Sequence, residues 1–301
     1  MNELVLRFFK RRCISTEMEL NEYILTAIEI IELADDEVNR LAEMHVERLQ
    51  HEAMWSVHHD MYKKCHEFTS GALATFLISH IGSAEALCRT AVESAVNLHY
   101  ACCGDKVGNI LGYFRTYIAT ERGQNSSWLR SIENSDYPDE AKDHHRALIE
   151  DKERSLNFYE YSLRKSLCMI NIDYDNHPGS WPNTFDRFSK IGKAVDYRTI
   201  YAALCSQAHN DPEDILNNLM SRIIEMDGYD ESVEIEKYIF SLNMVLTSIN
   251  FYLEASSIYL TKYNVTASTT FVTLTERTTE LQIKLQSSSE SYIQHPLKVN
   301  F

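Results

Sequence analysis

Apolar residues recur at helical spacing along most of the chain. Between 232 and 263, Ile235, Ile239 and Leu242 step by four and three residues along one stripe, which is the spacing of one face of an α-helix. The same pattern predicts further helices at 17–34, 36–65, 69–103, 105–122, 137–168, 185–191 and 212–226. Apolar side chains on both sides of the 69–103 stretch indicate a central, well-buried helix. The pattern therefore predicts an all-α protein.

The ends of the chain and two internal stretches lack this clear pattern. We expect 1–14 to form a short basic helix, 123–136 and 171–183 to be irregular, and 287–301 to be a mobile tail. Residues 266–275 are rich in β-branched side chains, as strands are. Phe271, Leu274, Leu281 and Leu285 nevertheless keep helical spacing, so a helix is favoured there.

The predicted organisation is a single helical bundle of long antiparallel helices with one extended, highly charged helix at 137–168. N-terminal helices occupy 1–66, the core bundle 67–264, and a C-terminal extension with its tail 265–301. Composition agrees, because Gly 9 and Pro 5 together are only 14 of 301 residues. A sheet protein needs many such residues for its turns, so few turns and long helices are expected.

Charge and cysteine usage restrict the partners and the compartment. The net charge of −15 argues against global attraction to nucleic acid or an anionic membrane, although Arg7, Lys10, Arg11 and Arg12 form one local basic cluster. Seven cysteines without CxxC pairing indicate reduced thiols. Because neither a signal peptide nor a membrane-spanning stretch is visible, we expect a cytoplasmic protein with no membrane partner.

Several common kinds of site are not indicated. None of the 12 histidines follows a Glu by three residues and none belongs to HExxH, so no metal site is predicted. The chain also lacks GxxxxGK[ST], GxGxxG and GxSxG, which argues against nucleotide-driven chemistry and a hydrolase elbow. No cofactor is predicted.

Polar side chains within apolar helices are the remaining candidates. Arg89 and Glu93 are four residues apart and lie side by side on a helix. If that helix is central the pair is buried, and a buried charge has to be paired or used. Asn97 and Tyr100 extend the same face.

The second candidate stretch is 197–214. Asp211 and Pro212 form a strong helix start, which places a helix junction just before them. Side chains recurring every four residues lead to that junction, with further polar ones alongside; the candidates are Tyr197, Arg198, Tyr201, Cys205, Ser206, His209 and Asn210. Such a junction can hold a side chain in a cleft, or it can lock two helices together.

At these two stretches the sequence resembles the bacterial domain of unknown function 5677. The resemblance lies in Arg89 and Glu93, and in a downstream element with Tyr201, Leu204, Cys205, Ser206, His209 and Asn210. It covers roughly 65–265. The resemblance implies a helical bundle and no established activity.

The fold type is also similar to HEPN domains, which include metal-independent ribonucleases of toxin and phage-defence systems. Their Arg-to-His spacing is absent before His209, where 202–204 are Ala, Ala and Leu. A nuclease would need Arg89 or Arg198 to approach His209, within one subunit or across a homodimer.

Three hypotheses follow. The first is a binding or regulatory module, or a component of a bacterial defence or toxin system, with a polar cleft formed by Arg89, Glu93, Tyr201, Ser206 and His209. Its partner would be RNA or a protein. The second is a HEPN-like ribonuclease with His209 as general acid and base. The third is a structural interaction protein, in which the same side chains form a buried network.

Overall fold

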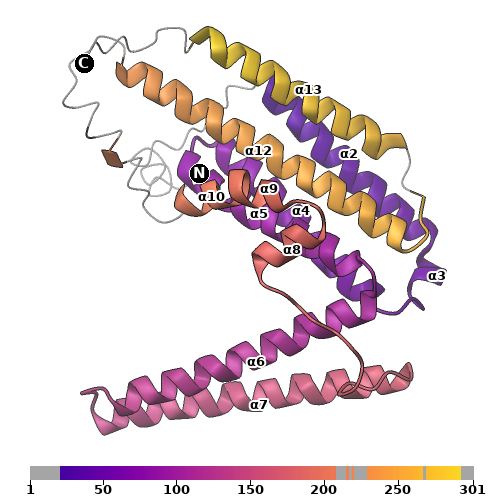
Figure 1. Ribbon diagram of the computed structural model, residues 1–301, viewed down its shortest axis with the longest axis vertical. Helices are drawn as coiled ribbons and strands as arrows, with labels where there is room; N and C mark the ends of the chain where they lie inside the picture. Colours follow the sequence, from indigo (N-terminus) through magenta and orange to yellow (C-terminus); the bar gives the residue numbers. More distant parts are fainter. Residues whose placement is uncertain (1–20, 208–214, 217–218, 220–228, 267–268, 293–301) are drawn as a thin grey trace, which may run out of the picture. The chain divides into compact units, whose positions relative to one another are not determined.

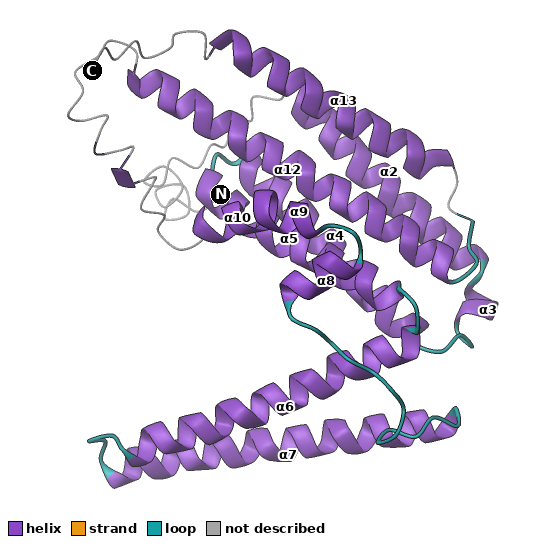
Figure 2. Cartoon of the chain, viewed as in Figure 1, coloured by secondary structure: helices purple, strands orange, loops and turns teal. Residues whose placement is uncertain are grey.

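The computed structural model describes residues 21–207, 215–216, 219, 229–266 and 269–292. Within these residues every regular element is a helix (Figures 1 and 2), which confirms the predicted all-α class. None of the described helices is long and apolar enough to cross a membrane. The predicted basic helix at 1–14, the helix start at Asp211–Pro212 and most of the 212–226 helix lie outside the described residues.

The chain divides into two compact units. The first combines residues 1–102 with 184–301, and the second is 103–183. The boundaries predicted near 66 and 264 remain a prediction.

The first unit is built around α5 (Ile81–Cys102) and α12 (Tyr229–Lys262). Helix α4 (Trp55–Leu77) packs against both, and α2 (Glu22–Met44) and α13 (Thr269–Tyr292) cover α12 (Figure 1). Val92, Val96 and Leu98 of α5 are fully buried, so this helix is central as its apolar faces predicted. Short elements complete the unit, namely α3 (Val46–Leu49), α8 (Thr184–Lys190), α9 (Ala194–Asp196), η1 (Tyr197–Tyr201) and α10 (Ala202–Gln207).

Polar groups are also buried between α2, α4 and α12. The Tyr62 hydroxyl donates to Asp35 Oδ1 at 2.6 Å and accepts from the Tyr252 hydroxyl at 2.9 Å. The rings of Tyr62 and Tyr259 stack with centroids 5.8 Å apart. Each buried hydroxyl of this group has a hydrogen-bond partner, so its removal from water does not destabilise the fold. Burial also raises the pKa of the Cys65 thiol to about 12, so this thiol is neutral and unreactive at pH 7.

The second unit is a hairpin of α6 (Lys106–Glu133) and α7 (Asp139–Met169), followed by the 170–183 segment (Figure 1). Residues 178–180 run directly against α6, because Gly108 and Gly112 leave room for them. A Cβ at 112 would lie 2.5 Å from the carbonyl carbon of Ser180, and one at 108 would lie 2.6 Å from the Pro178 oxygen. These two glycines therefore set how closely the segment packs.

Two predicted boundaries are wrong. No interruption occurs at Asp35–Asp36, since Asp35 accepts hydrogen bonds from Asn39 and Tyr62 and α2 continues to Met44. No helix begins at Thr69, because its hydroxyl donates to Cys65 O and α4 continues to Leu77. The breaks in the backbone lie instead at Met54 and Ser79, which have φ of 64° and 62°.

Two stretches predicted to be irregular or mobile are helical. Helix α6 extends through 123–133, where Ser126, Ser127 and Ser131 each donate to the carbonyl four residues earlier. Helix α13 extends to Tyr292, so residues 287–292 are not part of a tail. Its buried Phe271, Leu274, Leu281 and Leu285 confirm the helical spacing on which the helix prediction rested.

Candidate functional site

The two candidate stretches meet in the first unit, where η1 lies against α5. The Tyr201 hydroxyl donates to Glu93 Oε2 at 2.7 Å. The Arg89 guanidinium carbon lies 5.6 Å from the centroid of the Tyr201 ring, within the range of a cation–π contact. Residues more than a hundred positions apart in sequence therefore form one cluster.

A second arginine joins this cluster from α8. Arg187 Nη2 lies 3.6 Å from Glu93 Oε1, and the Arg187 side chain is only 7% exposed. Its guanidinium also donates to Thr184 Oγ1 at 3.2 Å. A buried guanidinium needs an acid beside it, so Arg187 ties α8 to α5 through Glu93. We call Arg89, Glu93, Arg187 and Tyr201 the polar cluster.

Sequence reasoning did not single out Arg187, although a signal was present. It stands between Phe185 and Phe188 in a short helix, and Phe188 is fully buried. A charged residue next to a core aromatic is a candidate for a buried ion pair.

Element η1 is a single turn of π-helix over Tyr197–Tyr201. Its two terminal tyrosines stack with ring centroids 5.4 Å apart, and Phe188 packs against both at 5.5 Å. Single π-turns inserted into α-helices are rare and frequently mark functional sites. The turn lies within the stretch that the residue pattern indicated.

Proton affinities in the polar cluster favour hydrogen bonding over proton transfer. Burial, and then donation to Glu93, raise the pKa of Tyr201 to about 12. Contact with Tyr201 raises the pKa of Arg89 further above its ordinary value. At neutral pH Tyr201 is therefore a fixed donor and Arg89 a fixed cation. A general base has to titrate near the working pH, and these two groups do not.

The expectation that the Arg89–Glu93 pair is buried is wrong. The Glu93 side chain is 33% exposed and Arg89 is half-buried; among the described elements, the short α8, η1 and α10 pack against this part of α5. The acid that α5 does bury is Glu85, at 6% exposure, where it accepts a hydrogen bond from Ser241 of α12.

Comparison with known proteins gives one match. Residues 56–227 match a family of unknown function (DUF5677). The chain belongs to this family. No curated protein and no solved structure matches it. The matched residues include all four members of the polar cluster.

The other predicted site residues of this DUF5677 chain fall into two groups. Arg198 is exposed on η1, with its guanidinium carbon 5.1 Å from the Phe185 ring centroid and 5.5 Å from that of Tyr197. Ser206 belongs to α10, but its side chain is outside the described part of the chain, as are His209 and Asn210 entirely. Among the described residues no three His, Cys, Asp or Glu side chains converge as metal ligands would.

A segment with a local excess of basic residues surrounds Arg198 in this family member. Residues 184–201 carry four basic and two acidic side chains, a net charge of +2 in a chain of −15. Lys190 is exposed and lies 5.6 Å from the Tyr100 ring centroid, whereas Lys193 pairs with Glu254 at 2.7 Å. We call residues 184–201 with their rings and cations the basic aromatic surface.

Proposed function

We propose that this protein is a binding or regulatory module that holds single-stranded RNA on the basic aromatic surface. The observation that carries the proposal is the exposed guanidinium of Arg198 stacked on the rings of Phe185 and Tyr197. Proteins bind single strands by combining cations that contact the backbone with aromatic rings and Arg planes on which bases stack. Both features are present within one short segment.

The charge distribution supports a local rather than a global attraction. A chain of −15 repels a polyanion as a whole. Arg187 and Lys193 are already paired with Glu93 and Glu254, so binding has to rest on Lys190 and Arg198 and to weaken as salt is added. Lys190 and Arg198 lie in positions open to solvent. Among the described residues these two cations contact aromatic rings and form no ion pair.

The polar cluster would act as a positioning device for this surface. Tyr201 and Arg187 bind the same Glu93 carboxylate from η1 and α8 respectively. They thereby fix the two elements that carry Arg198 and Phe185 on the edge of α5. In this account Glu93 orients the binding surface and does not contact RNA.

A ribonuclease is the second candidate, because a nuclease would also have to hold RNA here. His209 would be its general acid and base, close in sequence to α10. A role in a bacterial defence or toxin system is compatible with either activity and rests on the resemblance alone.

The test is fluorescence anisotropy of a labelled single-stranded RNA of mixed sequence with the full chain at low salt. We expect saturable binding that Arg198→Ala weakens by roughly tenfold, since losing one stacking contact costs on the order of 1–3 kcal/mol. Arg154→Ala is the matched control. It also removes one exposed arginine, in this case from the second unit, and should leave the affinity unchanged.

Equal affinities of the two variants would contradict the proposal, as would absence of binding by the unsubstituted chain. Gel analysis of the same RNA separates the two candidates. Cleavage that disappears in His209→Ala supports the ribonuclease, and intact RNA supports the binding module. Absence of binding together with a collapsed melting temperature in Tyr201→Phe supports a purely structural network instead.

A further inference from the structure

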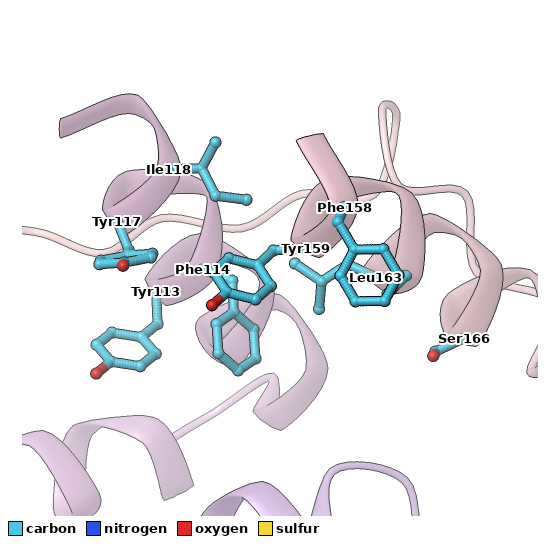
Figure 3. A pocket seen from close by; sticks show the side chains of 9 residues that line it. Tyr113, Phe114, Tyr117, Ile118, Phe158, Tyr159, Leu163 and Ser166 are labelled. Atoms are coloured by element: carbon cyan, nitrogen blue, oxygen red, sulfur yellow. The ribbon is translucent and has the colours of Figure 1, made fainter. Parts of the chain in front are cut away.

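The α6–α7 hairpin of the second unit carries a groove that the proposed function does not use. Its volume is about 460 Å³. Tyr113, Phe114 and Tyr117 line it from α6, and Phe158, Tyr159 and Ser162 line it from α7 (Figure 3). We call this the aromatic groove. From its geometry we infer that two copies of the chain associate through their aromatic grooves.

The rings at the groove are unusually exposed for their size. Phe158 is 65% exposed, Tyr159 49% and Tyr117 46%. Tyr161, three residues after Phe158 and thus beside it on α7, is 62% exposed. An aromatic side chain can bury roughly 200 Å², so Phe158, Tyr159 and Tyr117 together leave about 300 Å² of aromatic surface exposed at the groove. Surfaces of this kind on a folded protein mark sites of association.

This area is somewhat less than half of what a stable dimer requires from each partner, roughly 800 Å². The serines and threonines around the rings can supply the remainder. Rings at the centre of such an interface contribute most of its affinity. The groove therefore has the size and the composition of an interface core and not of a scattered set of surface residues.

The absence of charged side chains in the lining of the aromatic groove indicates which kind of surface can bind there. The lining contains no Asp, Glu, Lys, Arg or His side chain, so a charged ligand would lose its hydration without compensation. Two arginines of the hairpin are paired within it, Arg122 with Glu160 at 2.9 Å and Arg164 with Asp175 at 2.6 Å. The surface that fits is itself uncharged and aromatic.

A second copy offers such a surface. The same face has both a hollow between the helices and a projecting ring, Phe158. In an isologous two-fold contact each projecting ring enters the hollow of the other copy. Two helical hairpins paired in this way form a four-helix bundle, the common arrangement for amphipathic antiparallel helices.

The test is sedimentation equilibrium of the full chain between about 1 and 100 μM. We expect a concentration-dependent mass that approaches twice 34.9 kDa, and Phe158→Ser should raise the dissociation constant at least roughly tenfold. Tyr137→Ser is the matched control, because Tyr137 is 56% exposed in the same unit and does not line the groove. Phe158 is exposed, so its replacement should leave the helical circular dichroism intact.

A monomer at every concentration would overturn the inference, and so would a dimer that Phe158→Ser and Tyr137→Ser leave equally intact. Ser162→Trp provides a second route, because it fills the groove and should also separate the copies. A failure of self-association can be distinguished from a failure of RNA binding, because Arg198→Ala should not alter the mass measured by sedimentation.

Discussion

The two units of this protein are both helical, yet they are stabilised in different ways. In the first unit α5 and α12 contact helices on several sides, and Leu98 belongs to a large apolar core. In the second unit α6 and α7 pack against each other, and the 170–183 segment packs against α6. Ion pairs extend along this hairpin, including Arg122 with Glu160, Lys152 with Glu121 and Arg146 with Glu133.

The two units leave different kinds of surface accessible for function. A helix surrounded by others can present functional groups only at an edge, and the polar cluster lies at such an edge of α5. A two-helix hairpin leaves most of both helices uncovered, and exposed rings there form a groove. The first unit thus offers a charged surface and the second an apolar one.

The largest expected effect tests whether the apolar core of the first unit is less able to close a cavity than that of the second. Leu98→Ala should lower the free energy of unfolding by about 2–5 kcal/mol, because the surrounding helices cannot close the cavity. Leu156→Ala in α7 should cost less, although Leu156 is also only 1% exposed, because a two-helix layer can collapse onto the gap. Urea denaturation followed by circular dichroism measures both, and an equal or larger loss in Leu156→Ala would break the contrast.

A smaller effect tests the packing within the second unit. Gly112→Ala should destabilise by about 1–3 kcal/mol, because its Cβ would meet the backbone of Ser180. Gly123→Ala is the matched control in the same helix. A Cβ there meets nothing within 4 Å, so alanine should stabilise by roughly 0.5–1 kcal/mol. Thermal unfolding gives the two shifts, and shifts of the same sign would contradict the close approach of 178–180.

The smallest effect concerns pH and belongs to the first unit. Burial is the main cause that lowers the pKa of His59 and of His99. Lys63, Asp60 and Asp35 act on His59, and Glu254 and Lys193 act on His99. Below about pH 6.5 the unfolded chain binds protons at both positions more readily than the folded one. Stability should therefore be fully present above that pH and decline as pH falls.

The urea midpoint at pH 7.5 and pH 5.5 measures this decline. A variant with both His59→Gln and His99→Gln should show a smaller difference between the two midpoints. An unchanged difference would mean that other groups cause the pH dependence.

The sequence predicted helices well and their ends less well, for a physical reason. Apolar spacing gave α7, α8, α12 and the helical nature of α13 to within a few residues. The breaks at Met54 and Ser79 were missed, because left-handed backbone is adopted there by residues other than glycine. A polar stretch of α6 was predicted to be irregular because it is rich in serine. In the structure these serine hydroxyls donate to backbone carbonyls of the same helix.

The location of the site could be predicted from the sequence, but only some of its contacts could. Four-residue spacing identified Arg89, Glu93 and Tyr201, and the hydrogen bond between Tyr201 and Glu93 joins the two stretches. Arg187 was missed because an ion pair between α8 and α5 depends on tertiary packing that periodicity does not encode. The local excess of +2 over 184–201 can be counted in the sequence, whereas the contacts of Arg198 with Phe185 and Tyr197 depend on tertiary packing.

The central claim is that RNA lies on residues 184–201, and photocrosslinking tests it most directly. Single-stranded RNA containing 4-thiouridine would be irradiated with the full chain, and the crosslinked peptides identified by mass spectrometry. The account predicts crosslinks within 184–201, near Phe185 and Tyr197, that diminish in Arg198→Ala. Crosslinks confined to the basic cluster at Arg7–Arg12, or to α7, would contradict it.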